Sequence, residues 1–301
     1  MKIPLVKIER PIVQSKPKAA RVLFGKGLGC NLSKRRRKRK LIGSPKHYLD
    51  YLDREAPKLA RKIHSFFKHE ALRTTRILIS RAGLRKDDAQ DIIDNLDMSD
   101  WDVLVGVFSD TLTDQAREQA HNEFGTIGFD ASQDMTHAAD ERASEWARSH
   151  AAELVGKKFT ANGRLVNNPD KSLSVLDTTR DELRDLLSIA LDEGMTPAEV
   201  AAEIHDGWAF SEARASTIAR TELASAHAQG SLAAWKESGV VEMKQAILGS
   251  EHDLDDECDE NADDGPIPID EVFSSGDDMH PFHPNCVCVV VALTTGQGEE
   301  G

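Results

Sequence analysis

Four residues near the C-terminus carry the side chains that bind soft metal ions or form disulfides. Cys258 is followed, after an acidic stretch, by the segment His283-Pro284-Asn285-Cys286-Val287-Cys288. Three of the four cysteines of the chain therefore lie within thirty-one positions. Thiol and imidazole groups at this density are typical of a zinc site or of a disulfide. The candidate metal ligands are Cys258, His283, Cys286 and Cys288.

Three interpretations of these cysteines remain open from the residues alone. They can bind zinc, they can include a disulfide from Cys258 to Cys286 or Cys288, or they can pack a small core as apolar residues. If Cys286 to Leu293 is a strand, Cys286 and Cys288 point to the same face of it. Both thiols would then approach one ion.

The composition favours a helical protein over a β-sandwich. Of the 301 residues, 30% are charged and 5% are aromatic, which suits a chain rich in Ala, Leu, Glu and Arg. No apolar run approaches the roughly eighteen residues of a membrane span, so we expect no membrane partner. The start, Met1-Lys2-Ile3-Pro4, lacks the features of a signal peptide, and we expect a chain made in a cytoplasm.

Positive charge is concentrated at the start of the chain. Residues 1–49 hold fifteen Lys and Arg and one acid, whereas the remainder holds twenty-three basic and fifty acidic residues. Like charges at this density keep a backbone open until it meets a polyanion. Phosphate is the natural partner, because each neutralised phosphate releases counterions, although an import signal or a solubilising tail has the same composition. We predict a flexible basic arm over residues 1–45, with these candidate DNA-binding residues: Lys34, Arg35, Arg36, Arg37, Lys38, Arg39 and Lys40.

Helical periodicity from Tyr48 onward predicts a helical body over residues 46–210. Apolar residues recur at threes and fours from Leu49 to Phe67, and Pro57 is expected to break this helix locally. The same spacing predicts helices over residues 84–96, 101–116 and 138–154. Trp101 is expected to pack in a core.

Local patterns mark the later elements of the body. Asn162-Gly163 between β-prone pieces predicts a hairpin. Thr179 with Glu182 has the pattern of a capping box at the start of a helix. Thr196-Pro197-Ala198-Glu199 has the same pattern, with proline at the first helical position, and predicts the start of a second helix. Gly194 is placed to end the helix between these two starts.

A long helix from Glu212 to Ser238, capped by Ser211, is expected to open a C-terminal module over residues 211–295. Gly230 weakens this helix, and we expect it to allow close approach of the following strand. Arg220 and Glu222 are two positions apart and so do not face each other. A candidate structural network on this helix comprises Arg214, Arg220, Thr221 and Glu222.

Strands are expected over residues 240–248 and 287–293, with a short extended piece at 266–272. The acidic segment 253–265 is expected to be a loop that holds Cys258. The predicted fold is therefore mainly α: a helical body with a small C-terminal α+β module, followed by a tail over residues 296–301.

Three segments, in their order, resemble the phage Mu F-like minor head protein (head morphogenesis) family. They are RASTIARTELASAHAQGSLAAWKESGVV, ECDENADDGPIPIDEVF and HPFHPNCVCVVVAL. The likeness covers roughly residues 180–294, and its specificity lies in the order of the motifs. Two positions depart from the family pattern. Asn261 stands where the family often has a second cysteine, and Val287 stands where it has arginine.

The resemblance implies a minor head (minor capsid) protein that acts in head morphogenesis. Its expected partners are the portal protein, the major capsid or scaffolding protein, and DNA. It would be found in the host cytoplasm during assembly and then inside the head of the virion, at the portal vertex. Because of Asn261, a four-thiolate zinc site does not carry over whole, which leaves Cys258, His283, Cys286 and Cys288. The recurring Arg-Thr-Glu element implies a buried ion-pair network, with a binding surface as the alternative.

Enzymatic interpretations have weaker support. The chain has no Gly-x-Ser-x-Gly, no phosphate-binding loop and no His-Glu-x-x-His, so we expect no catalytic residues. The main alternative is a cysteine-type capsid maturation protease, in which Cys258 or Cys286 pairs with His283 or His280. A charge-driven DNA-binding protein is a further alternative. A nuclease or transferase would use acidic side chains among Asp253, Asp255, Asp256 and Asp263.

Overall fold

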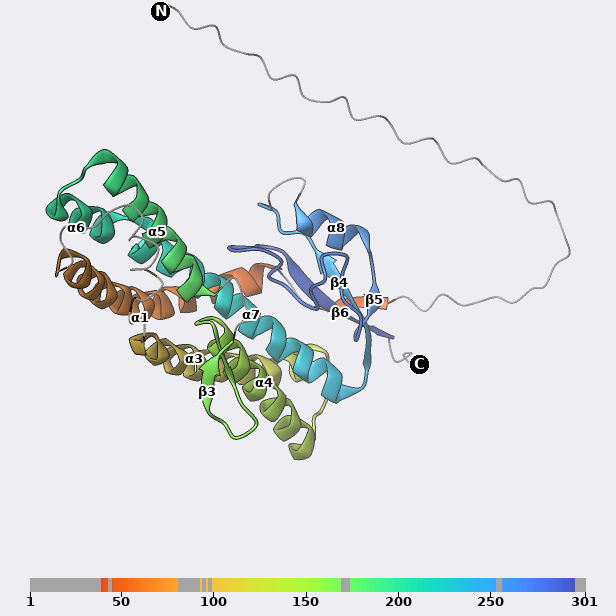
Figure 1. Cartoon of the computed structure of the whole chain (residues 1–301). Coiled ribbons are helices and arrows are strands. Elements are labelled where there is room, and N and C mark those ends of the chain that lie inside the picture. The colour runs from red at the N-terminus through yellow and green to blue at the C-terminus, as the bar shows by residue number, and fades with distance from the viewer. Residues whose placement is uncertain are drawn as a thin grey trace, which may run out of the picture. The chain divides into compact units, whose positions relative to one another are not determined.

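The structure is a computed structural model that describes residues 39–42, 45–80, 93, 96, 99–168, 174–252 and 256–295 (Figure 1). These residues belong to one compact unit, Arg37–Gly301. The helices are α1 (Pro45–Ser80), α3 (Asp102–Thr126), α4 (Gln133–Glu153), α5 (Val175–Glu193), α6 (Pro197–Asp206), α7 (Glu212–Ser238) and α8 (Glu257–Asp263), with 3-10 turns η1 (Ser99–Trp101) and η2 (Trp208–Phe210). The strands are β1 (Arg39–Ile42), β2 (Lys157–Phe159), β3 (Leu165–Asn167), β4 (Val241–Ile247), β5 (Ile267–Pro268) and β6 (Val289–Thr295). The predicted class, mainly α with a small C-terminal β element, is confirmed.

Helix α7 packs against α1, α3 and α4, and its other side meets the four-stranded sheet (Figure 1). Trp101 is fully buried against Phe66 and Phe67, as expected of a core residue.

Helix α1 runs through Pro57 without the predicted break. Pro57 lies on the exposed face of α1, where water can replace the hydrogen bond that proline cannot donate. Among the described residues, no helix is long and apolar enough to cross a membrane.

Several local predictions are confirmed. Thr196 and Glu199 form a capping box at the start of α6, and Ser211 caps α7. Gly194 ends α5 in the left-handed region, at φ 68°. The antiparallel pair β2 and β3 forms the predicted hairpin.

The predicted start of α5 at Thr179 is wrong. The helix begins at Val175, and the side chain of Ser174 accepts a hydrogen bond from the backbone of Asp177. Thr179 lies one turn inside the helix, where its hydroxyl donates to the carbonyl of Val175 at 2.7 Å. The earlier Ser-x-x-Asp pattern therefore supplies the cap.

The sheet has the order β1-β6-β4-β5, with antiparallel pairing throughout. Val289 and Val291 of β6 pack into the core of the helical body, whereas Val290 and Ala292 pack into a second core with α7. Because alternate side chains point to opposite faces of a strand, β6 is buried on both faces. This accounts for its unbroken apolar run.

The predicted flexible arm ends earlier than residue 45. Residues Arg39–Ile42 form β1 and pair with β6 from Ala292 to Thr295, because the edge of β6 presents backbone groups that a strand can satisfy. Two of the candidate DNA-binding residues, Arg39 and Lys40, thus belong to a strand. The other five, most of the predicted helix 84–96 and the tail 296–301 lie outside the described residues.

Gly230 permits close approach of a helix and not of the strand predicted to pack there. A Cβ at this position would lie 2.2 Å from the carbonyl oxygen of Ala116 in α3 and 3.0 Å from the Cβ of Gln119. The backbones of α3 and α7 are therefore in direct contact at this crossing.

We expect Gly230→Ala to destabilise the protein by about 1–3 kcal/mol, because the added methyl group forces α3 and α7 apart. The matched control is Gly106→Ala, at an exposed helical position in α3 with nothing within 4 Å. There the better helix propensity of alanine should stabilise by up to about 1 kcal/mol. Urea unfolding measures both, and a gain in stability for Gly230→Ala would contradict the contact.

Candidate metal centre

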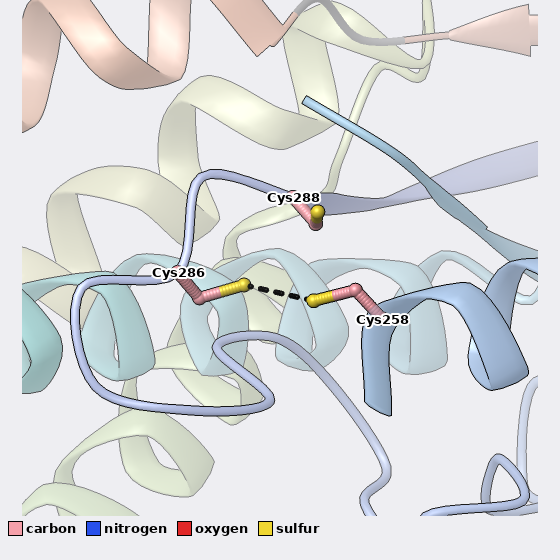
Figure 2. A group of neighbouring side chains, drawn as sticks. All are labelled: Cys258, Cys286 and Cys288. Atoms are coloured by element: carbon pink, nitrogen blue, oxygen red, sulfur yellow. Dashed lines mark hydrogen bonds between the residues drawn. The ribbon is translucent and has the colours of Figure 1, made fainter. Parts of the chain in front are cut away.

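Three cysteine side chains meet between α8 and the segment before β6 (Figure 2). The sulfur of Cys258 lies 3.5 Å from the sulfur of Cys286. The sulfurs of Cys258, Cys286 and Cys288 all lie within 4.8 Å of one another, and each residue is at most 1% exposed. This buried cluster can hold a metal ion.

Cys258 lies in the first turn of α8 and not in the loop predicted for the acidic segment. Asp256 is the N-cap, and its Oδ1 accepts a hydrogen bond from the backbone N–H of Cys258 at 2.8 Å. Aspartate is a preferred N-cap residue, and acidic side chains in the first turn favour a helix start. The cap fixes Cys258 beside the carboxylate of Asp256.

A tight turn positions Cys286. Its N–H donates to the carbonyl of His283 at 3.2 Å, and Asn285 adopts a φ of 60° within the turn. Asn285 attaches the turn to α7, since its backbone N–H donates to Thr221 Oγ1 at 3.1 Å and its Nδ2 to Thr217 Oγ1 at 3.3 Å. Asparagine tolerates this backbone region better than most residues do.

Cys288 precedes β6, so the prediction that a strand pleat aligns Cys286 with Cys288 is wrong. The sulfur of Cys288 accepts a hydrogen bond from the N–H of Gly249 at 3.4 Å. A Cβ at Gly249 would lie 2.5 Å from the carbonyl oxygen of Val287. The absence of a side chain at Gly249 therefore lets the two segments approach, and this contact places the third sulfur.

His283, the fourth predicted ligand, lies next to Cys258. Ligand atoms of His283, Asp256 and Cys258 lie within 4.8 Å of one another, and this group shares only Cys258 with the group of three cysteines. The Nδ1 of His283 is 3.0 Å from the carbonyl oxygen of Pro284; donation to that oxygen leaves Nε2 with a lone pair. Nε2 lies 3.3 Å from Asp256 Oδ2, and neither atom has a hydrogen-bond partner among the described residues. A cation bound beside both atoms would give each of them a partner.

The pKa values of the three cysteine thiols are shifted in different directions. Hydrogen bonding from Cys288, supported by backbone donors, lowers the pKa of Cys286 to about 5. Burial raises the pKa of Cys258, and the hydrogen bond to Cys286 raises the pKa of Cys288. The three groups titrate together, because a negative charge on one sulfur disfavours a second charge on its neighbours.

Asn261, which stands where the family often has a cysteine, has a structural role. It is fully buried, its Nδ2 donates to Ser275 Oγ at 3.0 Å, and its Oδ1 accepts from the N–H of Ser275 at 3.0 Å. Both ends of the amide are thus occupied in holding the loop that follows α8.

Arg214 is buried and links three elements. Its guanidinium donates to Thr179 Oγ1 and Thr178 Oγ1 at 2.7 Å each, to the carbonyl of Val175 at 3.1 Å and to that of Ala209 at 2.5 Å. Burial lowers the pKa of Arg214 to about 10, so it stays charged near neutral pH. These four neutral oxygens join α7 to the start of α5 and to η2.

The other network residues act separately, which differs from the single buried ion-pair network that was expected. Arg220 pairs with the exposed Asp53 of α1 at 2.7 Å. Glu222 is buried, and its Oε2 lies 2.6 Å from Nε2 of His150 in α4. Thr221 accepts the hydrogen bond from the turn before Cys286. The helical periodicity of α7 points these side chains toward different neighbours.

The remaining candidates are less well placed for chemistry. His280 is buried, and its Nδ1 accepts a hydrogen bond from the N–H of Val290 at 2.9 Å; burial lowers its pKa to about 3. Asp263 is exposed at the end of α8. Asp253 and Asp255 lie outside the described residues. Asp256 was predicted only as an acid of a nuclease or transferase, although an aspartate before Glu257 and Cys258 is a recognisable helix cap.

Comparisons of the chain with protein-family models, with curated proteins and with solved structures found no match.

We expect Arg214→Ala to destabilise the protein by about 3 kcal/mol, because it leaves several buried oxygens without a donor. Arg220→Ala removes a pair with an exposed partner and should cost less than about 1 kcal/mol. Both substitutions replace arginine by alanine on one helix. Any difference in their free energies of unfolding, measured by chemical denaturation, therefore reflects the position of the arginine. Equal losses of stability in the two variants would show that the burial of Arg214 does not determine how much it stabilises the protein.

Proposed function

We propose that this chain is a phage minor head protein that acts in head morphogenesis. The observation that carries the proposal is that the three motifs behind the family resemblance meet at one place. Thr221 of the Arg-Thr-Glu helix holds the turn at Asn285, and that turn sets Cys286 against Cys258 of the acidic segment. Motifs whose side chains contact one another support a shared structural role better than motifs that merely follow one another.

A structural role for the thiol cluster fits its burial. A cysteine protease needs a nucleophile that a peptide carbonyl can reach, whereas Cys258 and Cys286 are at most 1% exposed. The Nδ1 of His280 is already used by the backbone of β6. These contacts favour an assembly protein over a maturation protease.

The cluster is proposed to hold zinc as a structural ion, with Cys258, Cys286, Cys288 and His283 as ligands. Tetrahedral zinc with Zn–S bonds of about 2.3 Å separates two sulfurs by about 3.8 Å, close to the 3.5 Å between Cys258 and Cys286. The donation from Nδ1 of His283 to a backbone carbonyl is the outer contact that orients many metal-binding histidines. Zinc bound at Nε2 of His283 would also give this buried atom the partner that it lacks among the described residues.

The proposed partners are the portal protein, the major capsid or scaffolding protein, and DNA. To test this, the full chain is purified with a portal ring, beside a variant in which Lys34–Lys38 are changed to Gln. Portal association should be retained in both proteins. DNA affinity should fall in the variant, and the log–log salt slope should become shallower by about 0.9 for each phosphate that the arm no longer neutralises.

This variant leaves the residues of β1, Arg39–Ile42, unchanged. If the variant loses DNA affinity and neither protein associates with the portal ring, the chain is better described as a charge-driven DNA-binding protein. Equal DNA affinity of the two proteins, or a flat salt response, would refute DNA contact by the arm.

We expect the purified chain to contain about one zinc ion, which elemental mass spectrometry measures. Cys286→Ser and Cys288→Ser should each abolish metal binding and lower the melting temperature, since zinc binding contributes directly to folding. A chelator should have the same effect on the unsubstituted chain.

The matched control is Cys30→Ser, the same change at the fourth cysteine of the chain. It should retain zinc. Thiol titration in denaturant with and without reductant separates the other two interpretations. A metal-free chain with two missing thiols would establish a disulfide, and a metal-free chain with all thiols reactive would leave a packed core.

A further inference from the structure

A groove of about 380 Å³ lies between α5 and the segment from α6 to η2. Its lining includes the side chains of Leu186, Ile189, Met195 and Trp208. This volume falls within the range of about 300–1,000 Å³ of ligand-sized clefts. The groove therefore has room for large side chains from another molecule.

Two large apolar residues at this groove are exposed to solvent. Trp208 is 49% exposed and Ile189 is 56% exposed, and they are two of the five strongly exposed large hydrophobic residues among the described positions. Single exposed apolar residues are common on protein surfaces, whereas neighbouring ones beside a groove mark an interaction site. Tryptophan is also the residue type most enriched among side chains that dominate binding energy.

The groove is acidic, and none of its lining residues is Lys, Arg or His. All four of its carboxylates are exposed. They are Glu182, Asp185, Glu193 and Glu203. Such a field attracts cations and repels nucleic acid and anionic membranes.

The walls of the groove are held in place before any partner arrives. The capping box of Thr196 and Glu199 fixes the start of α6, and Arg214 ties Ala209 of η2 to the start of α5. A Cβ at Gly207 would lie 2.4 Å from the carbonyl oxygen of Glu203, so the turn into η2 is tightly packed. A preformed site loses less conformational entropy on binding.

We propose that this groove docks a basic segment of a partner protein, which inserts a large apolar side chain beside Trp208 and Ile189. Lysine or arginine residues on either side of that anchor meet the surrounding carboxylates. The apolar contact supplies affinity, while the carboxylates select for positive charge. The groove lies outside the thiol cluster and outside the three segments that carry the family resemblance.

The test measures binding of three synthetic peptides to the full chain by calorimetry. The first has a central pair of leucines flanked by lysines. The second replaces the leucines with serine at the same charge, and the third replaces the lysines with glutamate. The first should bind at least about tenfold more tightly than either control, and added salt should weaken it because the rim charges are exposed.

Substitutions then locate the site. Trp208→Ser and Ile189→Ser should each weaken binding of the first peptide by at least about tenfold. Val272→Ser removes an apolar side chain that is also 56% exposed but does not line this groove, and it should change nothing. Circular dichroism and melting confirm that each variant is folded; Ile189→Ser covers the case in which Trp208→Ser fails to fold.

Several results would overturn the proposal. Equal binding of the serine peptide would show that charge alone acts. Unchanged binding by a folded Trp208→Ser or Ile189→Ser variant would place the site elsewhere. Absence of binding by the first peptide at high micromolar concentration would exclude a groove with this specificity.

Discussion

Helix α7 is buried around most of its circumference, and the surrounding elements are organised by their contacts with it. Its alanines contribute to all three apolar cores, and Gly230 brings it to the backbone of α3. Arg214, which is also buried, joins it to α5 and η2. A helix rich in small residues permits such close neighbours, because the space near its axis is not filled by its own side chains. The stability of the protein is therefore expected to be sensitive to any larger side chain along α7.

The thiol cluster depends on the same helix. Thr217 and Thr221 hold the turn at Asn285, and this turn carries Cys286 to the sulfur of Cys258. The module around the cluster has a short helix, α8, and a strand of two residues, β5. Small units of this kind bury little apolar surface and gain most from a cross-link or a metal ion. The burial of the sulfurs and the shortness of the surrounding elements are consistent with stabilisation as the proposed role of the cluster.

Charge divides the chain into parts suited to opposite partners. The first 49 residues are strongly basic, whereas the rest carries fifty acidic residues against twenty-three basic ones. The groove at Trp208 concentrates this acidity around an apolar surface. The proposed DNA contact and the proposed groove contact would therefore use different residues of the chain. Such a combination suits a protein proposed to contact both DNA and other proteins during assembly.

The sequence by itself determined the features whose causes lie within a few residues. Helical periodicity, the caps at Thr196 and Ser211, and the Asn-Gly hairpin are local, and so they were predictable. It also identified Cys258, His283, Cys286 and Cys288 as a set, since their types are rare and their spacing is short. Only the tertiary structure decided that Gly230 meets Ala116, that β1 pairs with β6, that Arg220 and Glu222 have separate partners, and that Asp256 faces His283. These contacts join residues from about thirty to more than two hundred and fifty positions apart. Local propensity carries no information about such pairs, because each is selected by the packing of whole elements.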